Sequence, residues 1–186
     1  MTGTPGTGKT TVSRLLADAL HAKHLGPRTL LADEWVNCPY DEVGRTRIVS
    51  PENLRRSLRS YARQAQTGLV VDSHIVFEVT RPYRLARAIV LRCSPVVLRQ
   101  RLRSKRWTDR KIKENLLAEI MDICLWDAIK IYGRKRVTEI DTTKSDPEAV
   151  LRLAIACLKD GRTLKQRKVD WISTLKHEKT LRHYLT

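Results

Sequence analysis

The chain has 186 residues, which suits one domain that buries roughly 70% of the surface its unfolded form exposes. Hydrophobic residues make up 41% of the sequence and charged residues 30%, which excludes a disordered chain, and the lack of any run of about 18 apolar residues excludes a transmembrane helix. The net charge of +16 favours a polyanionic partner such as RNA, DNA or an anionic membrane, although an arginine-rich soluble surface has the same composition.

The chain opens with a glycine-rich segment from Gly3 to Thr10, which only Met1 and Thr2 precede. Such loops normally follow a strand in the middle of a sheet, and without that strand both neighbouring strands would carry unpaired backbone groups. The sequence therefore predicts either an unusually short first strand or a natural start a few residues upstream, and we favour the upstream start. Directly behind the loop, apolar residues between Val12 and Leu20 fall on one helical face.

Apolar runs of strand length then alternate with helical patterns. Strands are predicted at residues 29–31, 68–72, 86–93 and 136–141. Serine–proline pairs at 50–51 and 94–95 predict helix starts, because serine caps free N–H groups and proline fits the first helical position. Further helices are predicted from Thr108 to Gly133, from a Ser145–Glu148 capping box to Gly161, and from about Gln166. This alternation predicts an α/β fold with a parallel sheet covered on both faces.

The glycine-rich segment matches the phosphate-loop pattern GxxxxGK[ST] at every fixed position. Its glycines let backbone N–H groups converge on phosphates, and the helix behind it adds a positive N-terminal end. Lysine in this pattern bridges the terminal phosphates, and the next hydroxyl ligates Mg²⁺. A chance glycine-rich turn is the alternative, which the amphipathic helix behind the loop disfavours. The predicted nucleotide-binding residues are Gly3, Gly6, Gly8, Lys9, Thr10 and Thr11, with Thr10 also a metal ligand.

Asp72 ends the apolar strand predicted at 68–72, at the sheet edge where α/β proteins bind their ligands. A carboxylate at this edge can hold Mg²⁺ through the water shell of the metal. His74 faces the same side as Asp72 if the strand continues, because side chains two residues apart share a face. The alternatives are a strand-end cap for Asp72 and a structural role for His74.

Several motifs occur together in one order and spacing: GTPGTGKTT at 3–11, VDSH at 71–74, LRC before SP at 91–95, KRWTDRKIKEN at 105–115 and AEI at 118–120. The phosphate loop alone is generic, whereas the VDSH and W-KI-EN elements are specific. This series resembles the adenylate kinase isoenzyme 6 family, whose members are small P-loop kinase/ATPases of archaea and eukaryotic nuclei implicated in maturation of the small ribosomal subunit. The resemblance covers about residues 1–158.

The resemblance implies a nucleoside monophosphate kinase fold, a three-layer sandwich around a five-stranded parallel core, in residues 1–160. It implies an AMP-side segment at about 26–51 and a short lid at about 104–114. The basic helical extension predicted at 161–186 is not part of the usual core of the family. The implied reaction is ATP + AMP = 2 ADP with Mg²⁺, alongside ATP hydrolysis. Lys9, Asp72 and His74 are the implied catalytic residues, and His74 would position a water molecule or the hydration shell of the metal.

The lid departs from the arginine–glycine–aromatic pattern of the family. Lys105 stands where arginine is usual, and Arg106 stands where glycine is usual. Lysine supplies a point charge without the planar fork of arginine, so either residue could be the ATP contact. Both could also be solvated charges, and Trp107 is expected to anchor the lid rather than to stack.

Two other parts of the nucleotide site are less defined by sequence. The loop from Asp141 to Thr143 is expected to cup adenine through backbone groups. The AMP-side segment lacks the arginine pair of ordinary adenylate kinases, and its polar residues offer no single AMP ligand: Asp33, Asp41, Glu42 and Arg45.

The excess positive charge lies in two stretches. Residues 81–113 contain twelve basic residues against one acidic residue, and residues 159–186 contain eight against three. The basic tail could lie on rRNA through salt-dependent phosphate contacts. The alternative is a helix that packs Val169, Ile172 and Leu175 on the domain.

Together these features predict a broad-specificity adenylate kinase with ATPase activity that acts in small-subunit maturation. Its expected partners are ATP, ADP, AMP, a small-subunit ribosomal protein and rRNA, with no membrane. The alternatives are an ATP-switched ribosome assembly factor with little kinase activity, and a P-loop kinase for another small acceptor. The widely spaced cysteines and the lack of an apolar N-terminal stretch predict reduced thiols and a cytoplasmic monomer, or a nuclear one in a eukaryote.

Overall fold

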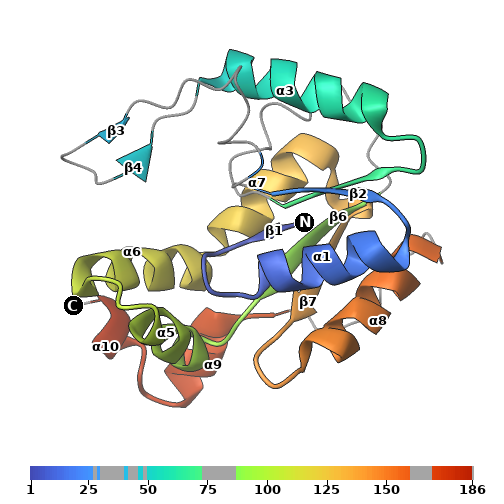
Figure 1. Ribbon diagram of the computed structural model, residues 1–186. Coiled ribbons are helices and arrows are strands. Elements are labelled where there is room, and N and C mark those ends of the chain that lie inside the picture. The colour runs from blue at the N-terminus through green and yellow to red at the C-terminus, as the bar shows by residue number, and fades with distance from the viewer. Residues whose placement is uncertain are drawn as a thin grey trace.

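The computed structural model of the chain describes residues 1–26, 29, 40–41, 46–47, 50–72, 87–159 and 169–185. Strands β1 (Thr2–Gly3), β6 (Ala88–Arg92) and β7 (Val137–Asp141) form a parallel sheet in the order β1-β6-β7 (Figure 1). Strands β2 (Lys23–Leu25) and β5 (Leu69–Val71) form a second parallel pair. The predicted α/β fold with a parallel sheet is confirmed.

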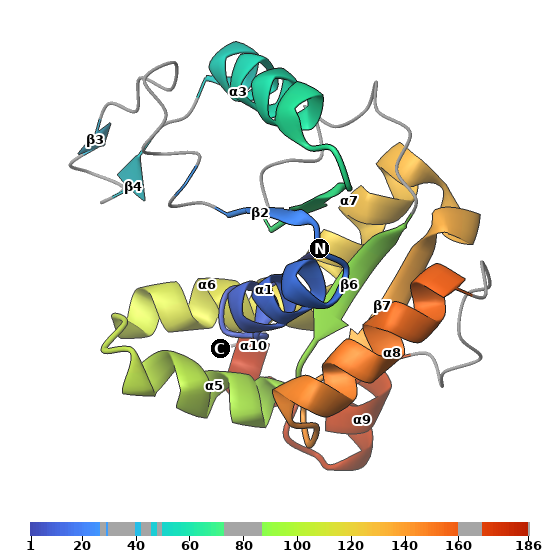
Figure 2. The same cartoon turned by 45° about the vertical axis from the view of Figure 1, so that its right-hand side comes forward.

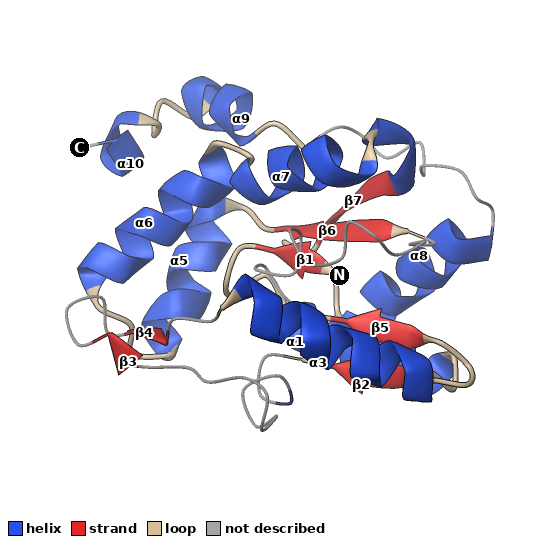
Figure 3. Ribbon diagram, turned by 90° about the horizontal axis from the view of Figure 1, so that it is seen from above, coloured by secondary structure: helices blue, strands red, loops and turns tan. Residues whose placement is uncertain are grey.

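Helices cover both faces of these strands. Figure 3 shows α1 and α8 on one side of the sheet and α7 on the other, and Figure 2 shows α5 and α6 beyond the end of β6. No helix among the described residues is both long enough and apolar enough to cross a membrane. The helices are α1 (Lys9–Ala19), α3 (Pro51–Gln64), α5 (Pro95–Ser104), α6 (Asp109–Ile120), α7 (Ile123–Tyr132), the 3-10 turn η1 (Arg134–Arg136), α8 (Pro147–Lys159), α9 (Trp171–His177) and α10 (Arg182–Leu185), and a small antiparallel hairpin is made by β3 (Tyr40–Asp41) and β4 (Thr46–Arg47).

Strand β1 spans only Thr2 and Gly3, one of the two alternatives that the sequence left open, and the favoured upstream start stays a prediction. Thr2 lies opposite Val90 and Gly3 opposite Leu91, and the Met1 amine donates to the Val71 carbonyl at 2.6 Å. The start of the chain therefore lies between β6 and β5. This position brings the phosphate loop, which follows β1, beside Asp72, which follows β5.

Three of the four predicted strands are confirmed as β5, β6 and β7. The strand predicted at 29–31 falls almost wholly outside the described residues. Strand β2 was not predicted, because in Lys23-His24-Leu25 only Leu25 is apolar and buried, so no apolar run marks it.

The single helix predicted from Thr108 to Gly133 is wrong. It is divided into α6 and α7, and Asp122 between them has a φ of +58°. Arg92 causes the break, because its guanidinium donates to the Glu119 carbonyl at 3.0 Å and also pairs with the Asp122 carboxylate. The last turn of α6 is thus capped by a side chain from β6 rather than continued.

Helix caps also differ from the prediction. Ser50 and Ser94 occupy the N-cap positions of α3 and α5, but neither side chain makes a capping hydrogen bond. The cap of α8 is Asp146, whose Oδ1 accepts from the Ala149 N–H at 2.7 Å, rather than the predicted Ser145. Thr108 caps α6 as predicted.

The C-terminal segment 169–185 packs against α5 and α6. Trp171 and Leu175 share one face of α9 and join Leu98, Leu102 and Leu116 in one buried cluster. The predicted packing face is therefore right for Leu175 and also for Val169, but wrong for Ile172, which is 40% exposed. The packed face differs from the predicted one because α9 begins at Trp171. Residues four apart share one face of a helix, so Trp171 lies beside Leu175.

A buried ion cluster lies where β6 meets α6. Arg92 is 1% exposed and pairs with Glu119 at 2.8 Å, with Glu139 at 2.9 Å and with Asp122. Burial opposes the charge of Arg92, yet Glu119 and Asp122 outweigh it, and the pKa of Arg92 is raised. The cluster keeps a cation in the core because each of its groups has a charged partner.

We predict that Arg92→Met lowers the free energy of unfolding by about 3–5 kcal/mol, because three carboxylates would lose their buried counter-charge. Arg134→Met is the matched control, since Arg134 also faces Glu139, at 3.5 Å, but is 54% exposed. It should cost less than about 1 kcal/mol. Urea unfolding measures both, and equal losses would contradict the account of the cluster.

Candidate nucleotide site

The phosphate loop lies between β1 and α1 and has the backbone that a phosphate cradle needs. Gly3, Gly6 and Gly8 have φ values of +138°, +94° and +95°, in the region that favours glycine. A Cβ on Gly3 would lie 2.3 Å from the Leu91 carbonyl oxygen, so no side chain fits there. The loop leads directly into the N-terminus of α1, whose free N–H groups favour anions.

Lys9 folds back over this loop. Its Nζ donates to the Thr4 carbonyl at 3.1 Å, and the same oxygen accepts from the Thr7 N–H at 3.2 Å and the Thr7 hydroxyl at 2.9 Å. Burial lowers the pKa of Lys9, while the nearby Asp72 carboxylate acts in the opposite direction. The lysine predicted to bridge phosphates is thus held beside the loop by a bond that phosphate oxygens can replace.

Asp72 is fully buried, and neither of its carboxylate oxygens has a hydrogen-bond partner among the described residues. An unpaired buried carboxylate is costly, and a cation would remove that cost. Thr10, in the first turn of α1, offers an exposed hydroxyl. These two residues fit Mg²⁺, which uses one or two protein oxygens and takes its other ligands from water and phosphate. Among the described residues, no group of three or more His, Cys, Asp or Glu side chains is arranged to hold a metal ion.

A cavity of about 190 Å³ lies on the outer side of the loop, against Thr11, Arg101, Thr142 and Pro147. Arg101 donates to the Thr142 carbonyl at 2.9 Å and to the Gly6 carbonyl at 3.5 Å. The Thr142 hydroxyl donates to the Thr7 carbonyl at 3.0 Å. The loop after β7, predicted to cup adenine, is therefore tied directly to the phosphate loop.

Arg101 is a site residue that the sequence analysis missed. It is one of twelve basic residues between 81 and 113, so composition does not single it out. Helical spacing could have done so, because Arg101 lies four residues before Lys105 and i,i+4 residues share a helix face.

The lid turn joins α5 to α6 through residues 105–108. Lys105 lies close enough to Lys9 for its charge to contribute to the lowered Lys9 pKa. Arg106 has a φ of +57°, a conformation that glycine would adopt without strain. The structure therefore places Lys105 at the end of α5, within electrostatic range of Lys9, and Arg106 at the tight point of the turn.

Several predicted residues lie outside the described part of the chain. They include His74 and most of the AMP-side segment. Of the polar residues considered there, Asp41 is described only as backbone in β3. Asp33, Glu42 and Arg45 are not described.

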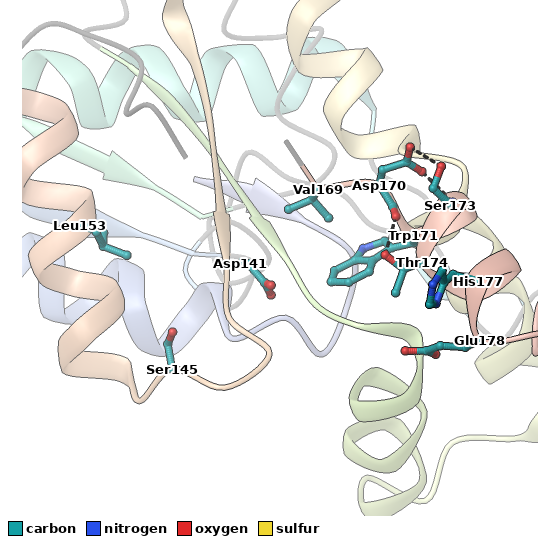
Figure 4. A pocket seen from close by; sticks show the side chains of 10 residues that line it. All are labelled: Asp141, Ser145, Leu153, Val169, Asp170, Trp171, Ser173, Thr174, His177 and Glu178. Carbon is teal, nitrogen blue, oxygen red and sulfur yellow. Dashed lines mark hydrogen bonds between the residues drawn. The ribbon is translucent and has the colours of Figure 1, made fainter. Parts of the chain in front are cut away.

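A second, larger cavity of about 980 Å³ lies between α8 and α9 (Figure 4). Leu153, Trp171 and His177 line it, together with Asp141 at the end of β7. Among its described lining residues, Ser145 alone also lines the cavity beside the phosphate loop. Of these two cavities, the smaller one is lined by the phosphate loop, which makes it the candidate nucleotide site.

Comparison with known proteins shows the family to which the chain belongs. A family model described as "AAA domain" matches residues 1–122. The protein named "Putative adenylate kinase" from Methanocaldococcus jannaschii is 32% identical over 173 residues, covering 92% of this chain and 90% of that protein. This chain belongs to the adenylate kinase family of P-loop phosphotransferases.

Two other archaeal members carry the same name. The Natronomonas pharaonis protein is 34% identical over 161 residues, covering 87% of this chain and 89% of its own length. The Archaeoglobus fulgidus protein is 32% identical over 179 residues, covering 94% of this chain and 92% of its own length. A match over 94% of the chain includes part of the segment after Leu158, so the family relationship extends into the C-terminal helices.

We predict that nucleotide binding takes up protons at alkaline pH. Burial lowers the Lys9 pKa in the free protein, and bound phosphates raise it again. Affinity for ATP should therefore fall as pH rises through the lowered pKa, and binding heats should depend on the ionisation enthalpy of the buffer. Calorimetry in two buffers measures this uptake. Lys9→Met should abolish it, and buffer-independent heats from the unaltered protein at alkaline pH would contradict the prediction.

Proposed function

We propose that this protein is a broad-specificity nucleoside monophosphate kinase that transfers the γ-phosphoryl group of Mg·ATP to AMP. The observation that carries the proposal is the pairing of a complete phosphate loop with the buried carboxylate of Asp72, which lies near Lys9 and has no hydrogen-bond partner among the described residues. The name of the archaeal relatives, adenylate kinase, supports AMP as the acceptor. A kinase for another small acceptor has no comparable support.

In this reaction an oxygen of the AMP phosphate forms a bond to the γ-phosphorus as the bond to the β-phosphate oxygen breaks, which leaves two ADP molecules. Lys9 leaves the Thr4 carbonyl and contacts the β- and γ-phosphates, where charge develops. Backbone N–H groups of Gly6, Gly8 and Thr10 orient the phosphates. Mg²⁺, held by Thr10 and through water by Asp72, would neutralise phosphate charge. His74 is assigned to position a water molecule or the metal's hydration shell, which would also support ATP hydrolysis.

The smaller cavity is assigned to the base of the nucleotide, and the lid turn to its phosphates. Thr11 and Arg101 flank the cavity, and Thr142 closes it from the loop after β7. Lys105 reaches the phosphates from the lid, and Arg106 holds the lid turn while offering a second positive charge.

We predict that Lys9→Ala lowers ATP turnover about 10²–10³-fold, because it removes a cation aimed at the transferred phosphoryl group. Lys23→Ala is the control, since Lys23 is an exposed lysine on β2 that contacts Gln64 and the Tyr61 ring. Turnover is measured as ADP formed from ATP with and without AMP. Turnover by Lys9→Ala equal to that of the unaltered protein would contradict the assignment of Lys9 to the nucleotide site.

A second role is favoured by charge. We propose that the protein acts in the maturation of the small ribosomal subunit, on rRNA and a ribosomal protein, as a cytoplasmic monomer or, in a eukaryote, in the nucleus. The net charge of +16 supports a polyanionic partner, and the tail presents exposed Lys176 and Lys179. ATP binding and slow hydrolysis would then gate release, and kinase activity would be the lesser function.

We predict that replacing both Lys176 and Lys179 by alanine weakens RNA binding and reduces its salt dependence. Each lost phosphate contact should lower the slope of log K against log[salt] by roughly 0.7–0.9. Point changes are needed because Trp171 and Leu175 of the same segment are part of the core. Lys135→Ala is the control, because Lys135 is exposed and lies in η1, just before β7 and outside the tail. An unchanged slope with the double variant would exclude the tail as an RNA contact.

A further inference from the structure

Glu119 connects the phosphate loop to the C-terminal helices. It is 1% exposed, lies in the last turn of α6, and its carboxylate accepts four hydrogen bonds from separate parts of the chain. The donors are the Thr4 hydroxyl at 2.5 Å, Arg92 Nε at 2.8 Å, the Cys93 N–H at 3.1 Å and Trp171 Nε1 at 3.0 Å. One side chain thus joins the loop, β6 and α9.

The path from α9 to the phosphate-binding lysine contains few steps. The Trp171 indole donates to Glu119, which accepts from Thr4, and the Thr4 carbonyl holds Lys9 at 3.1 Å. Every group in this path before Lys9 is buried. Buried hydrogen bonds to a carboxylate are strong and directional, so a shift of Trp171 is passed to Thr4.

Packing supplies a second link between α9 and the loop. Trp171 belongs to the buried cluster that contains Leu98 and Leu102. These two leucines approach the loop so closely that a Cβ on Gly6 would lie 2.8 Å and 3.1 Å from them. Hydrogen bonds at Thr4 and packing at Gly6 therefore constrain both halves of the phosphate loop from the side of α9.

We propose that Trp171 is a positioning residue of the nucleotide site. Docked α9 fixes Glu119, which fixes Thr4 and the loop conformation that receives the phosphates. Because such coupling is reciprocal, bound nucleotide also strengthens the docking of α9. The inference rests on the proposed function only for nucleotide binding and not for the choice of acceptor.

The first test is Trp171→Phe, which keeps an aromatic ring in the cluster and removes the indole N–H. Calorimetric affinity for Mg·ADP and Mg·ATP should fall about tenfold, the loss expected for a hydrogen bond to a buried charge. Trp126→Phe is the matched control, because Trp126 is 61% exposed and should leave affinity unchanged. Affinity equal to that of the unaltered protein would overturn the proposal.

A double-mutant cycle separates positioning from general destabilisation. Thr4→Val removes the hydroxyl at the other end of the path. If Trp171 acts through Thr4, the double variant should bind nucleotide no more weakly than Thr4→Val alone. Additive losses of affinity would show that the two residues act independently and would overturn the proposal.

Hydrogen exchange on the unaltered full chain needs no variant and so stands even if Trp171→Phe fails to fold. Mg·ADP should slow the exchange of α9 amides. An exchange rate of these amides that is the same with and without Mg·ADP would overturn the proposal. The two claims fail separately. If nucleotide binds and slows the exchange of α9 but no ADP forms from AMP, only the proposed kinase function is excluded. If Trp171→Phe leaves kinase activity unchanged, only the proposed coupling is excluded.

Discussion

The buried ion pair between Arg92 and Glu119 joins the segments on which the nucleotide site depends. Arg92 ends β6, and its guanidinium both stops α6 at Ile120 and holds Asp122 in a left-handed conformation. Arg92 supplies a buried counter-charge to Glu119, whose carboxylate also accepts bonds from Thr4 and Trp171. A break in one predicted helix is thus the consequence of a charge arrangement that also fixes the phosphate loop.

The surroundings of Asp72 differ from those of Arg92, and the difference distinguishes a structural charge cluster from a candidate binding site. Each of the three carboxylates around Arg92 pairs with its guanidinium, so the charges of this cluster compensate one another without a ligand. The Asp72 carboxylate is as deeply buried but lacks a hydrogen-bond partner among the described residues, with Lys9 nearby. A buried carboxylate without a hydrogen-bond partner is one that a ligand can complete, and it supports a candidate site at the ends of β1 and β5.

Sequence alone identified the phosphate loop, Asp72 and three strands, because each is marked by a local pattern. It missed β2, the break at Asp122 and the role of Arg101, because each depends on partners distant in sequence. It also chose Ile172 over Trp171 for the packed face of the tail, since the start of α9 is set by the Asp170 cap and not by hydrophobic spacing. The roles of all the predicted site residues, including Lys9, Asp72, His74 and the AMP-side residues, stay predictions.

The central claim is that this site passes a phosphoryl group from ATP to AMP, and the most direct measurement follows the γ-phosphate of labelled ATP. The account predicts that, with AMP and Mg²⁺ present, the label moves into ADP and two ADP molecules form for each ATP consumed. Label released as inorganic phosphate at the same rate with or without AMP would contradict it, and would assign the phosphate loop to an ATPase switch.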